Sequence, residues 1–102
     1  MTNEPYSLYT TSMTNTKTQA KVVMVKKNPC PYCDRAKTFF EARDIKFDII
    51  DLTDKPDELA AWKSKTGWAT VPIILINDKL IGGYTDIKAL DDEGKLNEIL
   101  YT

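Results

Sequence analysis

The sequence predicts one α/β domain in which a four-stranded mixed sheet is flanked by helices. Three observations predict this class. The chain has 102 residues, the size of a single domain. Its hydrophobic share of 42% and its charged share of 28% are ordinary for a globular protein. Short apolar runs alternate with segments whose apolar residues have helical spacing, which favours strands and helices in alternation.

The folded domain is expected at residues 20–102. Residues 1–19 are rich in Thr, Ser and Asn, and they bury too little apolar surface to offset the entropy of ordering them. We therefore predict a flexible N-terminal tail there. Residues 21–26 (Lys-Val-Val-Met-Val-Lys) follow as a short apolar run between charges, which is typical of a buried central strand.

The next two elements are a helix and a strand. Cys30 occupies the N-cap position and Pro31 the first helical position, and Phe39 and Phe40 follow at helical spacing. In residues 45–49 apolar and charged side chains alternate, which predicts a second strand. A right-handed crossover through the helix would make the two strands parallel.

A second helix is predicted between Pro56 and Gly67, because acidic residues fill its first turn and lysines lie near its end. Residues 71–76 and 79–81 then predict a third and a fourth strand. A tight turn at residues 77–78 (Asn-Asp) would join them as a hairpin.

Two further positions mark boundaries. Pro72 has no N–H to donate to a sheet, so it belongs at the start of the third strand or in a bend. Thr85 is a good N-cap for a last helical region, which breaks at Gly94 and resumes through Leu100.

Charge excludes some functions. The net charge is -1, and the basic residues are scattered among acidic ones, which argues against nucleic acid as a partner. No apolar run is long enough to span a membrane, and the N-terminus lacks a basic region followed by an apolar one. We therefore expect no membrane partner and a cytoplasmic location.

The sequence contains no histidine. Hydrolases that use a Ser-His-Asp or Cys-His arrangement are thereby excluded. Two cysteines remain, Cys30 and Cys33, three positions apart. A disulfide closing so short a loop constrains the unfolded chain little, so this spacing favours a chemical role over a structural one.

The position of the cysteines at a helix start predicts a redox pair. The Cys30 sulfur can accept hydrogen bonds from the N–H groups of Tyr32 and Cys33, and the helix dipole and Lys27 add positive potential that favours a thiolate. Cys33 lies deeper and would act as the resolving thiol. Two alternatives remain, a structural pair and half of a zinc site, but zinc generally needs four ligands, so we expect no metal.

Three motifs together resemble the dithiol glutaredoxins. They are residues 30–33 (Cys-Pro-Tyr-Cys), residues 70–72 (Thr-Val-Pro) before a strand, and residues 82–86 (Gly-Gly-Tyr-Thr-Asp) after the next strand. The resemblance covers about residues 22–100 and implies a thioredoxin-like fold.

The resemblance implies roles at the reaction centre. Cys30 would attack a glutathione mixed disulfide as the nucleophile, and Cys33 would resolve protein disulfides. Pro72 would follow a cis peptide bond and face the cysteines. The backbone of Val71 would bind the cysteinyl part of glutathione, which then lies like an added strand.

The resemblance also implies contacts with the ends of glutathione. Thr85 and Asp86 match the residues that bind its γ-glutamyl end, although a helix start favours the same two residues without any ligand. Lys27 matches a lysine that contacts the glycyl carboxylate, and its alternative is a solvated strand end. Tyr32 would pack beside the thiolate, or it is ordinary helix surface.

One departure from the family pattern concerns charge. Many relatives have an arginine just before the Thr-Val-Pro motif, where this chain has Trp68 and Ala69. Lys63 or Lys65 is a candidate replacement for that cation. Trp68 is expected to cover the edge of the site or the core.

The function implied is a glutathione-dependent thiol–disulfide oxidoreductase acting as a monomer. Glutathione is its reducing co-substrate, no cofactor stays bound, and its clients are disulfide-containing or glutathionylated proteins, with ribonucleotide reductase a candidate. Two alternatives are a glutaredoxin-like protein reduced by thioredoxin reductase and an iron–sulfur cluster carrier.

Overall fold

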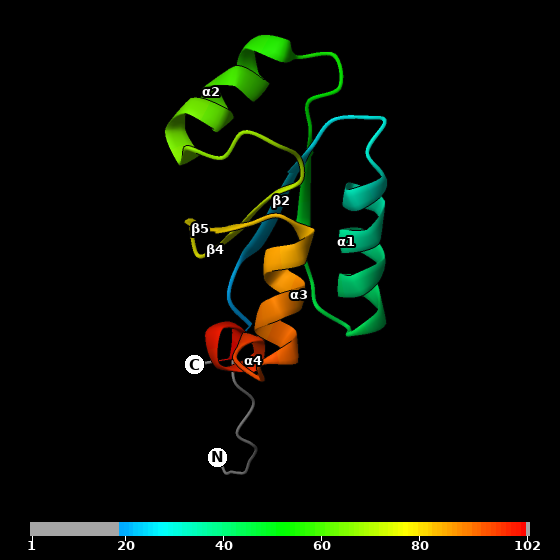
Figure 1. The fold of residues 1–102 in the computed structure, drawn as a ribbon, viewed down its shortest axis with the longest axis vertical. Helices are drawn as coiled ribbons and strands as arrows, with labels where there is room; N and C mark the ends of the chain where they lie inside the picture. Colours follow the sequence, from blue (N-terminus) through cyan, green and yellow to red (C-terminus); the bar gives the residue numbers. More distant parts are fainter. Residues whose placement is uncertain (1–18, 102) are drawn as a thin grey trace, which may run out of the picture.

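The computed structural model describes residues 19–101, and Figure 1 shows how their helices and strands are arranged. The elements in chain order are β2 (Val22–Lys26), α1 (Pro31–Ala42), β3 (Asp48–Asp51), α2 (Pro56–Thr66), β4 (Ile73–Ile76), β5 (Lys79–Gly82), α3 (Tyr84–Asp92) and α4 (Leu96–Leu100). The flexible tail predicted for residues 1–19 lies outside the described residues, apart from Gln19.

The strands form one four-stranded sheet in the order β3-β2-β4-β5. Strand β2 is parallel to β3 and antiparallel to β4, and β4 is antiparallel to β5. The predicted mixed sheet is therefore confirmed. Asn77 and Asp78 in the β4–β5 turn have φ values of 51° and 65°, as a two-residue hairpin turn requires.

Helices bury both faces of the sheet, and the central strands are apolar for that reason. Met24 and Ile74 pack with side chains of α1, α3 and α4 on one face. Their neighbours Val25 and Ile73 pack with Leu59 of α2 on the other face. Figure 1 shows α1 and α3 close together and α2 apart from them. Alternate residues of each central strand thus belong to two separate clusters.

The second strand begins later than predicted, at Asp48 instead of residue 45. Ile45 is buried, but its N–H donates to the Phe40 carbonyl at the end of α1 rather than to the sheet. Phe47 packs against Phe40, with ring centroids 5.0 Å apart. The apolar residues at 45 and 47 therefore belong to a connecting segment that packs on α1. Ile49, which does lie in the strand, is 43% exposed.

The third helical region also begins differently from the prediction. Gly83 is the N-cap of α3, and Thr85 lies inside the helix, so the prediction that Thr85 is the cap was wrong. The Asp86 carboxylate accepts a hydrogen bond from the Gly83 N–H at 2.9 Å. This bond closes the first turn two residues before the expected start.

The remaining boundaries follow the sequence closely. Gly67 ends α2 in the left-handed conformation, and Gly94 separates α3 from α4 with a φ of 73°. Gln19 forms two hydrogen bonds with the backbone of Lys46, at 2.7 and 2.9 Å, and so fixes the chain just before β2. No helix in residues 19–101 is long and apolar enough to cross a membrane.

Candidate active site

Cys30 and Cys33 form a disulfide at the start of α1. As predicted, Cys30 is the N-cap and Pro31 the first helical residue. The Cys30 sulfur accepts a hydrogen bond from the Cys33 N–H at 3.0 Å. Cys30 is 8% exposed and Cys33 only 1% exposed, so an attacking thiol or a client reaches Cys30 first.

The loop that leads to Cys30 is anchored to the end of β3. The Thr53 hydroxyl accepts a hydrogen bond from the Asn28 N–H at 3.0 Å and donates one to the Asp51 carboxylate at 2.5 Å. Two hydrogen bonds from Thr53 hold the pKa of the Asp51 carboxyl below its ordinary value. The bond from the hydroxyl has the larger effect and the bond from the N–H the smaller one. Asp51 therefore stays ionised at neutral pH, and this stabilising contribution is lost only as the pH falls through the lowered pKa.

We expect Thr53→Val to loosen this loop without disturbing the fold. The substitution keeps the side-chain shape but removes both hydroxyl bonds, so the free energy of unfolding should fall by about 1 kcal/mol. Amide hydrogen exchange at Asn28 should become faster. Thr38→Val, at an exposed position on α1, is the matched control. Equal exchange at Asn28 in wild type and Thr53→Val would contradict the anchoring role.

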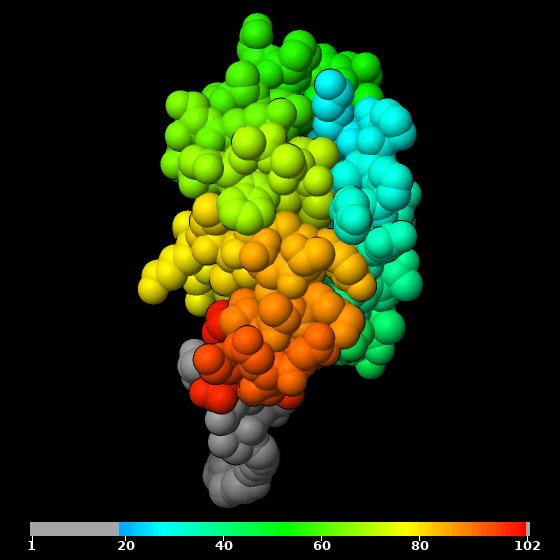
Figure 2. Space-filling view, viewed as in Figure 1, coloured from blue at the N-terminus to red at the C-terminus, as the bar shows by residue number. Residues whose placement is uncertain are grey.

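Three segments form a groove of about 330 Å³, and one of them carries Tyr32, the residue just before Cys33. Figure 2 shows the start of α1, the segment before β4 and the start of α3 together on one face. We call this the active-site groove. Its lining residues come from these segments, and they are Tyr32, Trp68, Thr70, Val71, Pro72, Gly83, Tyr84, Thr85 and Asp86.

The active-site groove brings together most of the residues predicted to bind glutathione. Tyr32, Val71, Pro72, Thr85 and Asp86 all line it, although they come from three distant parts of the sequence. Tyr32 is 51% exposed and directly follows the helix start that holds Cys30. The groove therefore extends from Tyr32, which lies between the two cysteines in the sequence, to the start of α3.

The predicted cations do not line this groove. Lys27 is exposed and is not among the lining residues, so its contact with glutathione stays a prediction. Lys65 lies over the Trp62 ring, 5.2 Å from its centroid, and lines a different hollow. Lys63 is likewise absent from the groove. Trp68 both lines the groove and packs against the core under α2, as predicted.

The peptide bond between Val71 and Pro72 is cis, as the resemblance implied. Pro72 is buried and precedes β4, which confirms its expected place at the start of that strand. A second cis bond joins Asn28 to Pro29. The sequence analysis did not predict this one.

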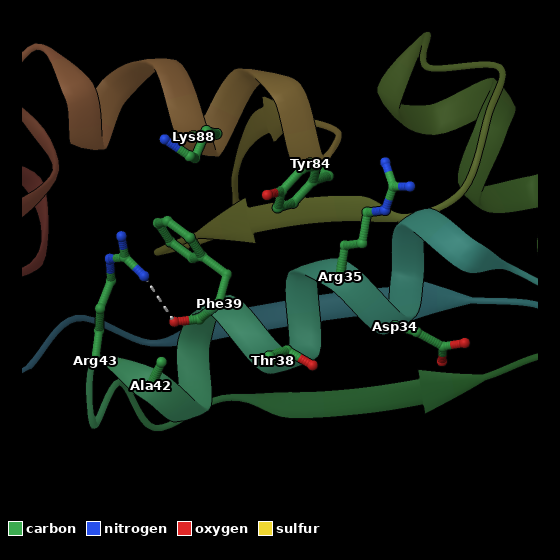
Figure 3. A pocket seen from close by; sticks show the side chains of 8 residues that line it. All are labelled: Asp34, Arg35, Thr38, Phe39, Ala42, Arg43, Tyr84 and Lys88. Carbon is green, nitrogen blue, oxygen red and sulfur yellow. Dashed lines mark hydrogen bonds between the residues drawn. The ribbon is translucent and has the colours of Figure 1, made fainter.

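A second hollow, of about 400 Å³, lies between α1 and α3 beside the active-site groove. Figure 3 shows Phe39 of α1 and Tyr84 of α3 close to each other there. Tyr84 lines both spaces, and its ring centroid is 6.3 Å from that of Tyr32. Sequence reasoning missed Tyr84, because only its place between the two glycines and Thr85 marked it.

Metal binding has no evident site in this part of the chain. Within residues 19–101, no three Cys, Asp or Glu side chains lie close enough together to share an ion.

Comparisons with known proteins agree with this geometry. The glutaredoxin family model matches residues 22–81. Glutaredoxin-C6 of rice (Oryza sativa subsp. japonica) is 42% identical over 91 residues, which are 83% of this chain and 79% of the rice protein.

Solved glutaredoxin structures share the fold. The solution structure of the glutaredoxin from Brucella melitensis has a TM-score of 0.73 at 35% identity, covering 83% of this chain and 92% of that one. The crystal structure of a buckwheat glutaredoxin–glutathione complex has a TM-score of 0.71 at 33% identity, covering 78% and 74%. The fold is thus thioredoxin-like, and the chain belongs to the glutaredoxin family of thiol–disulfide oxidoreductases.

Proposed function

We propose that this protein is a glutathione-dependent oxidoreductase that reduces protein disulfides and glutathione mixed disulfides. Cys30 is the nucleophile and Cys33 the resolving thiol. The observation that carries the proposal is the placement of Cys30 as the N-cap of α1, where its sulfur accepts the Cys33 N–H. The same N–H would stabilise a thiolate at Cys30 once the disulfide is reduced.

Reduction of the enzyme consumes two glutathione molecules. The thiolate of the first attacks the Cys30 sulfur, the Cys30–Cys33 bond breaks, and Cys33 leaves as a thiolate that takes up a proton. The thiolate of the second attacks the glutathione sulfur now bound to Cys30. Glutathione disulfide leaves and Cys30 is released as the thiolate.

Reduction of a protein disulfide then restores the oxidised pair. The Cys30 thiolate attacks one client sulfur, and the other client sulfur leaves and takes up a proton. Cys33 loses its proton and attacks the Cys30 sulfur, which frees the second client thiol and re-forms the Cys30–Cys33 disulfide. With a glutathione mixed disulfide, Cys30 attacks the glutathione sulfur, so Cys33 is not needed.

Glutathione would lie in the active-site groove and contact backbone and side-chain groups there. Val71 precedes β4, and its N–H and C=O would pair with the cysteinyl part as an added strand does. The first N–H groups of α3, at Thr85 and Asp86, lack partners within the helix and would receive the γ-glutamyl carboxylate. The Asp86 carboxylate would meet the α-amino group, and Tyr32 and Pro72 would cover the sulfurs. Glutathione is bound in the buckwheat structure.

The proposal extends to the oligomeric state, the compartment and the clients of the protein. The protein would act as a monomer in the cytoplasm, where glutathione keeps thiols reduced. Its clients would be disulfide-containing or glutathionylated proteins, of which ribonucleotide reductase is one candidate.

A coupled assay tests the proposal. Purified protein is given a glutathione mixed disulfide with glutathione, glutathione reductase and NADPH, and separately with thioredoxin reductase and NADPH. We expect turnover in the first mixture and little in the second. Turnover that depends on thioredoxin reductase would instead support the alternative of a glutaredoxin-like protein that thioredoxin reductase reduces. A brown protein after anaerobic reconstitution with iron and sulfide, inactive in both mixtures, would support the cluster carrier.

A further inference from the structure

Trp68 lines the active-site groove and is packed on two sides. One side of its ring packs against the core cluster under α2. On another side, its ring atoms lie 3.8 Å from where a Cβ on Gly83 would be. Its backbone N–H donates to the Thr66 hydroxyl at 3.2 Å, and that hydroxyl donates to the Trp62 carbonyl at 2.7 Å. The end of α2 thus holds the backbone of Trp68, while the core cluster and Gly83 border its ring.

The polar atom of this wall has no partner. The indole N–H of Trp68 is buried and makes no hydrogen bond with any described residue. Tyr32 and Tyr84 line the same groove as Trp68. Three of the nine residues that line the groove are therefore aromatic.

The lining of the groove carries a single charged side chain. Asp86 is the only charged residue among those that line it, and one of its oxygens already accepts the Gly83 N–H. No lysine or arginine within residues 19–101 is part of the lining. Glutathione carries two carboxylates and one ammonium group at neutral pH. The ammonium can meet Asp86, but the lining offers the carboxylates neutral donors and no cation.

We propose that Trp68 determines substrate specificity, so that the groove prefers protein disulfides in which an apolar or aromatic residue neighbours the half-cystine. Such a side chain buries its surface against Trp68 and the two tyrosines, where the rings also pair favourably. A glutathione mixed disulfide gains less from this lining, because the lining itself offers no cation to a carboxylate. This inference rests on the proposed function, since it concerns which disulfide Cys30 attacks.

The test compares two peptides that each contain one intramolecular disulfide, with Phe or Gly next to the same half-cystine. Wild-type protein should reduce the Phe peptide with a kcat/KM about tenfold above that of the Gly peptide, as expected for one apolar contact. The difference should lie in KM. Equal values for the two peptides in wild-type protein would overturn the proposal without any variant.

Two variants then assign the preference to Trp68. Trp68→Arg should bring the Phe-to-Gly ratio close to unity and lower KM for a glutathione mixed disulfide about tenfold, because it supplies a cation to a carboxylate. Trp68→Phe keeps an aromatic wall and should keep the preference. Folded Trp68→Arg protein with wild-type ratios would overturn the assignment.

The same data separate this inference from the proposed function. Wild-type protein that turns over none of these disulfides with glutathione would contradict the proposed function itself. Wild-type protein that turns them over without a preference between the peptides contradicts only the role of Trp68.

Discussion

Cys30→Ser should abolish the reduction of both protein disulfides and glutathione mixed disulfides. A serine hydroxyl is not ionised at neutral pH and cannot form a mixed disulfide, so kcat/KM should fall at least about a thousandfold. The coupled glutathione reductase assay measures both substrates. The free energy of unfolding of Cys30→Ser should be close to that of reduced wild-type protein, because neither protein then contains the disulfide.

Cys33→Ser is the matched control for this prediction. Cys33 is 1% exposed and bonds to Cys30 from within α1, which is why we propose that it only resolves a disulfide held on Cys30. The variant should keep most activity with glutathione mixed disulfides and lose it with protein disulfides. Full activity in Cys30→Ser, or loss of both activities in Cys33→Ser alone, would reverse the assigned roles.

Gly82→Ala should destabilise the protein and damage the active-site groove together. Gly82 has a φ of 127°, which L side chains rarely adopt. An added Cβ would also lie 2.6 Å from a carboxylate oxygen of Asp86, the oxygen that accepts the Gly83 N–H. Backbone strain and the lost cap together should lower the free energy of unfolding by about 2–4 kcal/mol. Denaturant unfolding measures this change.

Gly94→Ala separates the two causes. Gly94 also has a positive φ, but nothing lies within 4 Å of where its Cβ would be. It should therefore cost only about 1 kcal/mol, and KM for glutathione mixed disulfides should not change. Gly82→Ala should raise that KM because Asp86 is displaced. If both variants lose the same stability and keep the same KM, Asp86 does not couple the helix start to the groove.

Elements with local chemical signals could be predicted from the sequence. The start of α1 is marked by Cys30 and Pro31, because only a helix start combines a side-chain acceptor with a residue that needs no N–H bond. The hairpin at Asn77 and Asp78 is marked by residues that tolerate positive φ. The continuous apolar run of β2 is explained by helices on both faces of the sheet.

Other boundaries depended on tertiary contacts that a local pattern does not contain. The alternation at residues 45–49 indicated a strand, but Ile45 and Phe47 pack against α1 instead. Thr85 had good N-cap chemistry, but the bond from Gly83 to Asp86 starts α3 earlier. In both places a contact with another residue overrides the local preference.

The active site could be predicted only in part, because it too depends on tertiary contacts. Its motif residues Tyr32, Val71 and Asp86 do converge on one groove. The sequence shows Trp68 and Ala69 where many relatives have an arginine. It does not show whether a nearby lysine takes the place of that arginine in the groove. Only the fold shows that the neighbouring lysines lie outside the groove and that, among residues 19–101, the indole N–H has no hydrogen-bond partner.

The most direct test of the account is transfer of a glutathionyl group to Cys30. Reduced Cys33→Ser protein, in which Cys30 is the sole cysteine, is mixed with a glutathionylated peptide near pH 6.5, and rapid quenching with mass spectrometry follows the adduct. We expect one glutathionyl group on Cys30, formed much faster than on an unstructured cysteine peptide and removed by free glutathione. Transfer no faster than to that peptide would contradict the claim that the start of α1 and its groove activate Cys30 towards glutathione disulfides.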